Sequence, residues 1–283
     1  MALRALLLIT LGTSMALGQS TPRLVAFHKA PDVTGERWAV FDSRVDSMDT
    51  TISVPSKEPM VVRSTTTRST VADGVGTKTG VRIHYSHRHD RSENSFMLER
   101  IDSHDMTGRA FHIELVDGKT RVTQEGKRPP VDAGMIARDA AGWWAPRALH
   151  RVIPDRPVRV GEKLAIPTAV ASDFIGALVE DENEHITSLV LTLSGVRDAR
   201  GIRAAAFAVA LRLEGEMTVD EAKLALEVAY TGEMLVTTDS CRLLSIEATG
   251  TRKLQPAGKS PKPRGEIRAT GVTVLSRKII YSR

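Results

Sequence analysis

Histidines are concentrated in one short segment, RIHYSHRHD, at residues 82–90. His87 and His89 are two residues apart, and such side chains project from the same face of a β-strand, where they could share a metal ion. The alternation of Val81, Ile83 and Tyr85 with polar residues predicts a strand here. We expect His87 and His89 to lie on the apolar face of that strand.

A metal site at these histidines needs a further ligand, because two imidazoles do not complete the coordination shell of zinc. His104, Asp105 and His112 are the candidates, provided that a neighbouring strand brings one of them close. The competing interpretation is a strand end that emerges into solvent, where histidine and arginine are well hydrated. The sequence favours this second interpretation, and no cofactor is expected.

The adjacent pair Trp143 and Trp144 is a candidate for ligand binding, since aromatic residues make up only 4% of the chain. Tryptophan combines a large apolar surface with one hydrogen-bond donor. Packing in the core, or between a helix and a sheet, is the competing interpretation, and it is favoured because large aromatic side chains usually fill cores.

The sequence lacks the motifs of the common enzyme chemistries. The stretches DGKT at 117–120 and GKS at 258–260 end like phosphate-binding loops, but each lacks the first glycine and is interpreted as a turn. Neither HExxH nor GxSxG occurs. Asp181, Glu182 and Glu184 could supply an acid pair, but we expect them to be solvated in a loop between a helix and a strand. No catalytic residue is therefore predicted, and a non-enzymatic role is favoured.

The first eighteen residues predict export from a bacterial cell. Arg4 precedes an apolar run from Ala5 to Leu11, and the small residues Ala16 and Gly18 then lie two apart, which is the layout of a cleaved signal peptide. The apolar run is shorter than the roughly 20 residues that cross a bilayer. We expect residues 1–18 to be removed, leaving a protein without a transmembrane anchor in the periplasm or outside the cell.

The charge pattern bears on nucleic-acid binding, and the cysteine content bears on disulfide bonds. The 39 lysines and arginines are interspersed among 34 aspartates and glutamates rather than clustered, so a nucleic-acid partner is not expected. Cys241 is the single cysteine, which excludes an intramolecular disulfide. We expect it to act as a small apolar residue and not as a reactive thiol.

Hydrophobic periodicity predicts an α+β protein, mainly antiparallel β, with two sheet-based halves and a few short covering helices. Residues 19–155 form the expected N-terminal β-rich half. Residues 156–283 form the expected C-terminal half, in which one helix precedes five strands joined by short turns, as in an antiparallel meander. The expected strands of the first half lie at 35–54, 60–71, 81–86, 111–115 and 119–126, the expected helices at 131–150 and 168–181, and a turn at 198–201.

This layout resembles a loose group of uncharacterised bacterial exported β-rich proteins. The segment PDRPVRVGEKL at 154–164 carries the resemblance, with Pro157 and the turn Val160-Gly161-Glu162 preceding a strand. More distantly, a long antiparallel sheet covered by helices is similar to the half-barrel of periplasmic lipoprotein carriers. That resemblance implies a fold that holds acyl chains between sheet and helices.

Three functional hypotheses follow. The first is a binding or carrier module for an apolar ligand, such as a lipid or another envelope component. The second is a structural or interaction protein of the envelope that meets its partner through exposed strand edges. A secreted hydrolase is the third. An apolar cavity of several hundred cubic ångströms would support the carrier, whereas a filled core would support the interaction protein.

Overall fold

The computed structural model describes residues 23–29, 34–103, 106–116, 119–124, 126–127, 133–134, 136–137, 146–180, 183–219, 222–257 and 266–282. The expected signal peptide, His104, Asp105 and the pair Trp143 and Trp144 lie outside these residues.

Most of the described chain is antiparallel β-sheet, as the alternating pattern predicts. A two-stranded pair consists of β1 (Leu24–Val25) and β8 (Val158–Arg159). The main sheet has twelve described strands: β2 (Arg37–Ser53), β3 (Met60–Gly76), β4 (Gly80–Asn94), β5 (Met97–Ser103), β6 (Arg109–Val116), β7 (Lys119–Thr123), β9 (Lys163–Ile166), β10 (Glu184–Ala199), β11 (Ile202–Val219), β12 (Ala222–Thr237), β13 (Leu243–Pro256) and β14 (Glu266–Ser282).

Neighbouring strands in the sheet are mostly neighbours in sequence, and short turns join them. Between β10 and β11, Asp198 Oδ1 accepts a hydrogen bond from Gly201 N at 2.8 Å. Gly201 has φ of +80°, a conformation that costs glycine little because it has no Cβ. The turn predicted at 198–201 is therefore present.

The expected division into two sheet-based halves is not confirmed. β14 pairs with β2 along the whole length of both strands, from Glu266 opposite Ser53 to Ser282 opposite Arg37. Strands from both parts of the chain therefore belong to one sheet, in the order β7-β6-β4-β3-β2-β14-β13-β12-β11-β10-β9, with β5 also paired to β4.

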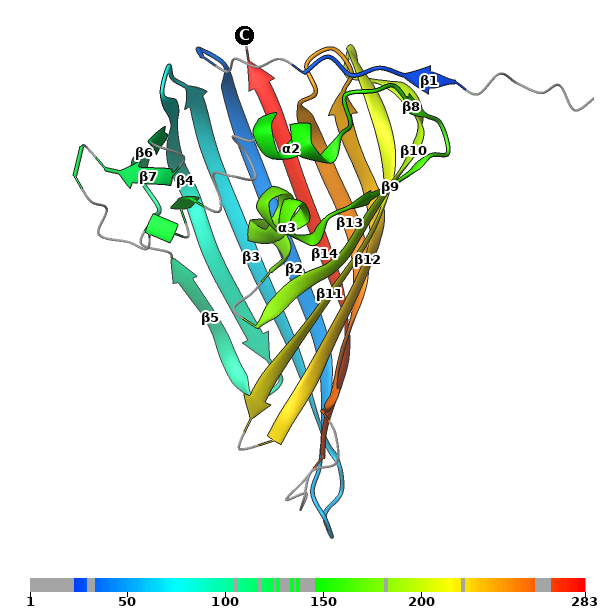
Figure 1. Ribbon diagram of the computed structural model, residues 1–283. Helices are drawn as coiled ribbons and strands as arrows, with labels where there is room; N and C mark the ends of the chain where they lie inside the picture. Colours follow the sequence, from blue (N-terminus) through cyan, green and yellow to red (C-terminus); the bar gives the residue numbers. More distant parts are fainter. Residues whose placement is uncertain are drawn as a thin grey trace, which may run out of the picture.

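The sheet curls, and short helices lie in its concavity (Figure 1). They are α2 (Pro146–Val152), followed by α3 (Thr168–Ala171), one turn of π-helix η1 (Ser172–Gly176), and α4 (Ala177–Val179). The helix expected at 168–181 is thus present in three pieces. We call residues 168–179 the cover segment, and the sheet face beneath it the inner face. No helix among the described residues has the length and apolar character needed to cross a bilayer.

A β-bulge in β4 changes which side chains face inward. Tyr85 lies opposite Ala72, but His87 lies opposite Val71, so Ser86 is an extra residue between them. Before the bulge, Val81, Ile83 and Tyr85 are buried on the inner face; after it, the buried residue is Arg88. His87 and His89 therefore lie on the outer face, so the expectation that they share the face of Val81, Ile83 and Tyr85 is wrong.

Gly74 is required by its neighbour on β2. The indole ring of Trp38 lies across Gly74, and a Cβ built on this glycine would be 2.3 Å from Trp38 Cε2. Trp38 is only 4% exposed, so the ring has little room to move away. The contact fixes the packing of β2 on β3 at the wide end of the sheet.

We predict that Gly74→Ala lowers the free energy of unfolding by about 1–3 kcal/mol, because the added methyl group overpacks the indole. Chemical denaturation measures this change. In a Trp38→Leu background the same substitution should cost clearly less, since the ring that it meets has gone. Equal costs in the two backgrounds would contradict this account.

Candidate functional site

The cover segment packs on an apolar patch of the inner face. Its large buried side chains are Phe174, Ile175, Leu178 and Val179. Together with residues of five successive strands they line one apolar space, to which the sheet contributes Leu189, Leu191, Val209, Leu211, Met234, Ile246, Ala248 and Leu275. Alternation along β10–β14 brings these side chains to one face.

The space left between the cover segment and the sheet is about 10 Å³. That volume is at most about what one water molecule needs, and far below the size of ligand sites. In this conformation the apolar patch is therefore closed and filled, without room for a ligand.

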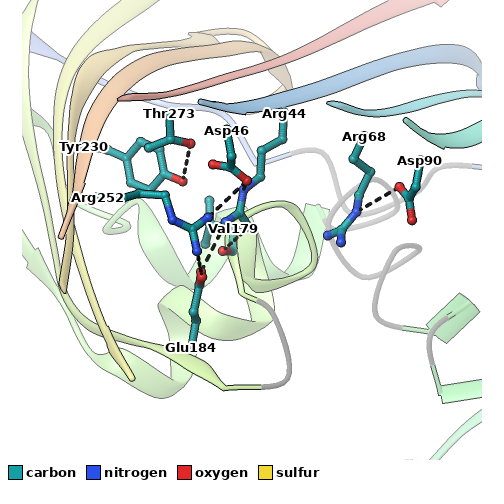
Figure 2. A network of polar contacts seen from close by, with 9 residues as sticks. All are labelled: Arg44, Asp46, Arg68, Asp90, Val179, Glu184, Tyr230, Arg252 and Thr273. Carbon is teal, nitrogen blue, oxygen red and sulfur yellow. Dashed lines mark hydrogen bonds and ion pairs between the residues drawn. The ribbon is translucent and has the colours of Figure 1, made fainter. Parts of the chain in front are cut away.

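Next to the apolar patch, four ionised side chains are buried against one another (Figure 2). Arg44 Nε lies 2.9 Å from Asp46 Oδ2, and Arg252 Nη1 lies 3.1 Å from the same oxygen. Glu184 joins both arginines: its Oε2 lies 3.3 Å from Arg44 Nη2, and its Oε1 contacts Arg252 Nη2. Desolvated charges persist only when paired in this way, so the four side chains act as a unit.

This ion network is joined directly to the cover segment. Arg44 Nη1 donates a hydrogen bond of 2.7 Å to the carbonyl oxygen of Val179, the last residue of α4. A second contact holds the same end, because Glu180 Oε1 accepts hydrogen bonds from Ser172 Oγ at 2.7 Å and Ile186 N at 3.1 Å. The C-terminal end of the cover segment is thus fixed to β2 and β10.

The environment of Glu184 differs from the solvated loop that the sequence predicts. Its side chain is only 3% exposed, so the interpretation of Glu184 as a solvated loop acid is wrong. It is the first residue of β10 and lies opposite Gly215, and its carboxylate points into the ion network. Asp181 and Glu182 lie outside the described residues.

Further ion pairs continue along the inner face toward β4. Arg277 makes a two-point contact with Asp42, through Nε to Oδ1 at 2.9 Å and Nη2 to Oδ2 at 2.8 Å. Arg68 Nε lies 3.3 Å from Asp90 Oδ1 (Figure 2). The half of the inner face on β14, β2, β3 and β4 therefore carries ion pairs among apolar residues such as Leu275, Val40 and Ile83, whereas on β10–β13 the charges belong to the network of Glu184 and Arg252.

Sequence reasoning missed Arg44, Asp46 and Arg252, although a signal was present. Arg44 and Asp46 have the same parity as Trp38 and Val40, and Arg252 has the same parity as Ile246 and Leu254. Charged residues that continue an apolar stripe indicate buried, paired charges.

His87 and His89 remain close together on the outer face. Their rings stack with centroids 4.0 Å apart, and Ser69 Oγ lies 2.9 Å from His87 Nε2. Burial, and next the neighbouring His89, lower the pKa of His87.

His112 lies opposite Arg82, and its Nε2 is 3.4 Å from Thr77 Oγ1. Within the described ranges no three His, Cys, Asp or Glu side chains gather as a metal site would need. The histidines lie within β4, which continues to Asn94, and not at a strand end.

Cys241 is buried next to the start of β13, with φ of +50°. Burial raises the pKa of its thiol to about 11. A thiol with this pKa is almost entirely protonated at neutral pH, and the thiolate is the nucleophilic form.

Comparison with known proteins gives only weak resemblances of fold. No family model matches the chain, and no curated protein matches it. A lipovitellin structure, described for its lipid–protein interactions, is 8% identical with a TM-score of 0.38 over 89% of this chain and 26% of the lipovitellin chain. A LolA-superfamily protein, NE2245 from Nitrosomonas europaea, is 11% identical with a TM-score of 0.16 over 89% and 87% of the two chains. An outer membrane protein of Vibrio cholerae, OmpT with loop L8 deleted, is 8% identical with a TM-score of 0.11 over 86% and 99%.

We predict that Glu184→Gln lowers the free energy of unfolding by about 3–5 kcal/mol, because two buried arginines lose the carboxylate between them. Urea denaturation followed by circular dichroism measures the loss. The control is Glu233→Gln, which breaks a surface pair with Arg197 whose side chains are 43% and 52% exposed. Such a pair contributes less than about 1 kcal/mol. Similar losses in the two variants would refute a special role for the buried network.

We also predict that Cys241 in the folded protein does not react with Ellman's reagent at pH 8, since the thiol is buried and has a raised pKa. Absorbance of the released thionitrobenzoate should show one equivalent only after denaturant is added. Rapid stoichiometric reaction without denaturant would contradict the buried position.

Proposed function

We propose that the protein is a carrier or binding module for a long-chain apolar ligand, which binds on the inner face in place of the cover segment. The observation that supports this function is a concave apolar patch spanning five strands and covered by only twelve residues of broken helix. A ligand that displaces the cover segment would occupy a ready-made apolar groove. We propose that it acts after export, in the periplasm or outside the cell.

The energetics of the cover segment define the class of ligand. Transfer of one large apolar side chain to water costs about 1.5–3 kcal/mol, so exposing Phe174, Ile175, Leu178 and Val179 would cost about 6–12 kcal/mol. Opening into water alone is therefore rare. A ligand must bury enough apolar surface of its own to offset this cost.

An acyl chain contributes about 0.8 kcal/mol for each methylene group that it buries. Roughly eight to fifteen buried methylenes are then needed to balance the opening of the cover segment. Short-chain amphiphiles should bind poorly and long-chain ones well. The charged half of the inner face, with Arg44 and Arg68 next to the apolar patch, suits the polar end of such a molecule.

The alternative is a structural or interaction protein of the envelope. The residual space of about 10 Å³ favours it, because a permanently filled core needs no ligand. In that case the cover segment is an ordinary part of the core, and removing an apolar group from it would reduce stability without creating affinity.

We predict that saturated fatty acids of sixteen carbons displace a fluorescent apolar probe from the protein, whereas those of eight carbons do not. Phe174→Ala should tighten binding of the longer acid by on the order of tenfold, since less apolar surface is exposed on opening. Fluorescence titration measures both effects, and native mass spectrometry confirms the stoichiometry.

The matched control is Phe207→Ala. Phe207 is a buried phenylalanine on β11 that stacks on Phe27 with ring centroids 5.9 Å apart, outside the residues that line the covered patch. It should lose stability without a gain in affinity. Absence of binding at every chain length, or the same change in both variants, would count against the carrier and in favour of the interaction protein.

A further inference from the structure

The outer face of the sheet carries a second concavity at its wide end. Its volume is about 480 Å³, within the range of ligand sites. An adjoining concavity of about 430 Å³ shares Arg82, His84 and Ala110 with it. We call the two together the outer trough. It is separate from the apolar patch under the cover segment, because the lining residues of the two sites do not overlap.

Strand register arranges the outer trough as two parallel rows of side chains that cross the strands. One row runs from Ser282 through Arg37, Val75 and Arg82 to His112. The other row runs from Ile280 through Ala39, Asp73 and His84 to Ala110. The two rows thus combine small and apolar residues with two guanidinium groups, two imidazoles and one carboxylate, and Arg109 also lines the trough.

Arg37 and Arg82, like Arg203 and Arg212 of β11, have no side-chain partner among the described residues. Within the part of the chain that the structure describes, neither Arg37 nor Arg82 forms a hydrogen bond or ion pair through its side chain, and both are exposed. Elsewhere on the surface, Arg197 pairs with Glu233 and Arg268 with Glu266. Two unpaired guanidinium groups beside a concavity provide positions for external carboxylates.

We infer that the outer trough binds an acidic, extended segment of a partner protein. Arg37 and Arg82 lie in one row on β2 and β4, with β3 between them, so their backbones are about 10 Å apart. Side chains on one side of an extended segment recur about every 7 Å, so two carboxylates of such a segment can each meet one arginine. Val75, which lies between the arginines, and Ala39 in the second row would contact the rest of the segment.

A single small anion fits this arrangement less well. A phosphate would contact only the two guanidinium groups and would leave the apolar residues of the trough uncovered. The length of the trough, with two concavities sharing Arg82 and His84, also suits a chain of several residues.

The test uses a fluorescein-labelled ten-residue peptide of alternating glutamate and threonine, with a glutamine-for-glutamate peptide for comparison. Fluorescence anisotropy should show saturable binding of the glutamate peptide and at least tenfold weaker binding of the glutamine peptide. The double variant Arg37→Gln, Arg82→Gln should weaken binding of the glutamate peptide at least tenfold. Circular dichroism checks that the variant is folded.

The control variant is Arg212→Gln, Lys253→Gln, which removes the same charge from the outer faces of β11 and β13. It should change peptide affinity less than twofold. An equal loss in the two double variants would overturn the proposal, because it would show attraction to overall charge. Absence of binding, equal binding of the two peptides, or Arg37- and Arg82-dependent binding of phosphatidylglycerol vesicles without peptide binding would also overturn it. Phe174→Ala should leave peptide binding unchanged, so the result is independent of the proposed carrier function.

Discussion

Antiparallel pairing between β14 and β2 is the contact on which the candidate site depends. It joins the last strand of the chain to the first long one, and residues from distant parts of the sequence then meet on one inner face. Arg44 and Asp46 come from β2, Arg252 comes from β13, and Glu184 from β10. If β14 and β2 separated, the network would lose the two contacts that cross between its sides, Arg44 with Glu184 and Arg252 with Asp46, while each arginine would keep one carboxylate partner on its own side. The pairing and the network therefore support each other.

The inner face combines an apolar surface, which any apolar group can cover, with a charged surface, which needs partners of a defined charge and position. The apolar patch is stabilised by any apolar material that excludes water, whether a helix or a ligand. The ion network tolerates only partners of correct charge and position, because desolvation offsets most of the Coulomb attraction. We interpret the network as fixing where the cover segment ends, through the hydrogen bond from Arg44 to Val179, while the apolar contacts provide most of the stabilisation. The specific contact holds the C-terminal end of the cover segment, and only non-directional packing holds the rest. A ligand could therefore displace the cover segment from its N-terminal end.

The strands could be predicted from the sequence because one face of each is apolar, as in the series Leu189, Leu191 and Leu193. The cover helix and the turn before Ile202 also follow from local rules. Two features could not be predicted. The pairing of β14 with β2 depends on a contact between strands more than 200 residues apart, for which alternation gives no signal. The environment of Glu184 depends on two arginines that only the folded sheet brings to it. The role proposed for Trp143 and Trp144 remains a prediction.

The extra residue at Ser86 has an evolutionary consequence for β4. On its N-terminal side odd-numbered positions face the interior, and on its C-terminal side even-numbered ones do. If Ser86 paired with Val71 instead of being extra, Arg88 would face solvent and His87 and His89 would turn inward, which exchanges the surroundings of every later side chain in the strand. A homologue that lacks Ser86 would keep Tyr85 and Arg88 facing inward, so gaps in aligned sequences should be tolerated at this position and avoided at residues 81–85 and 87–90.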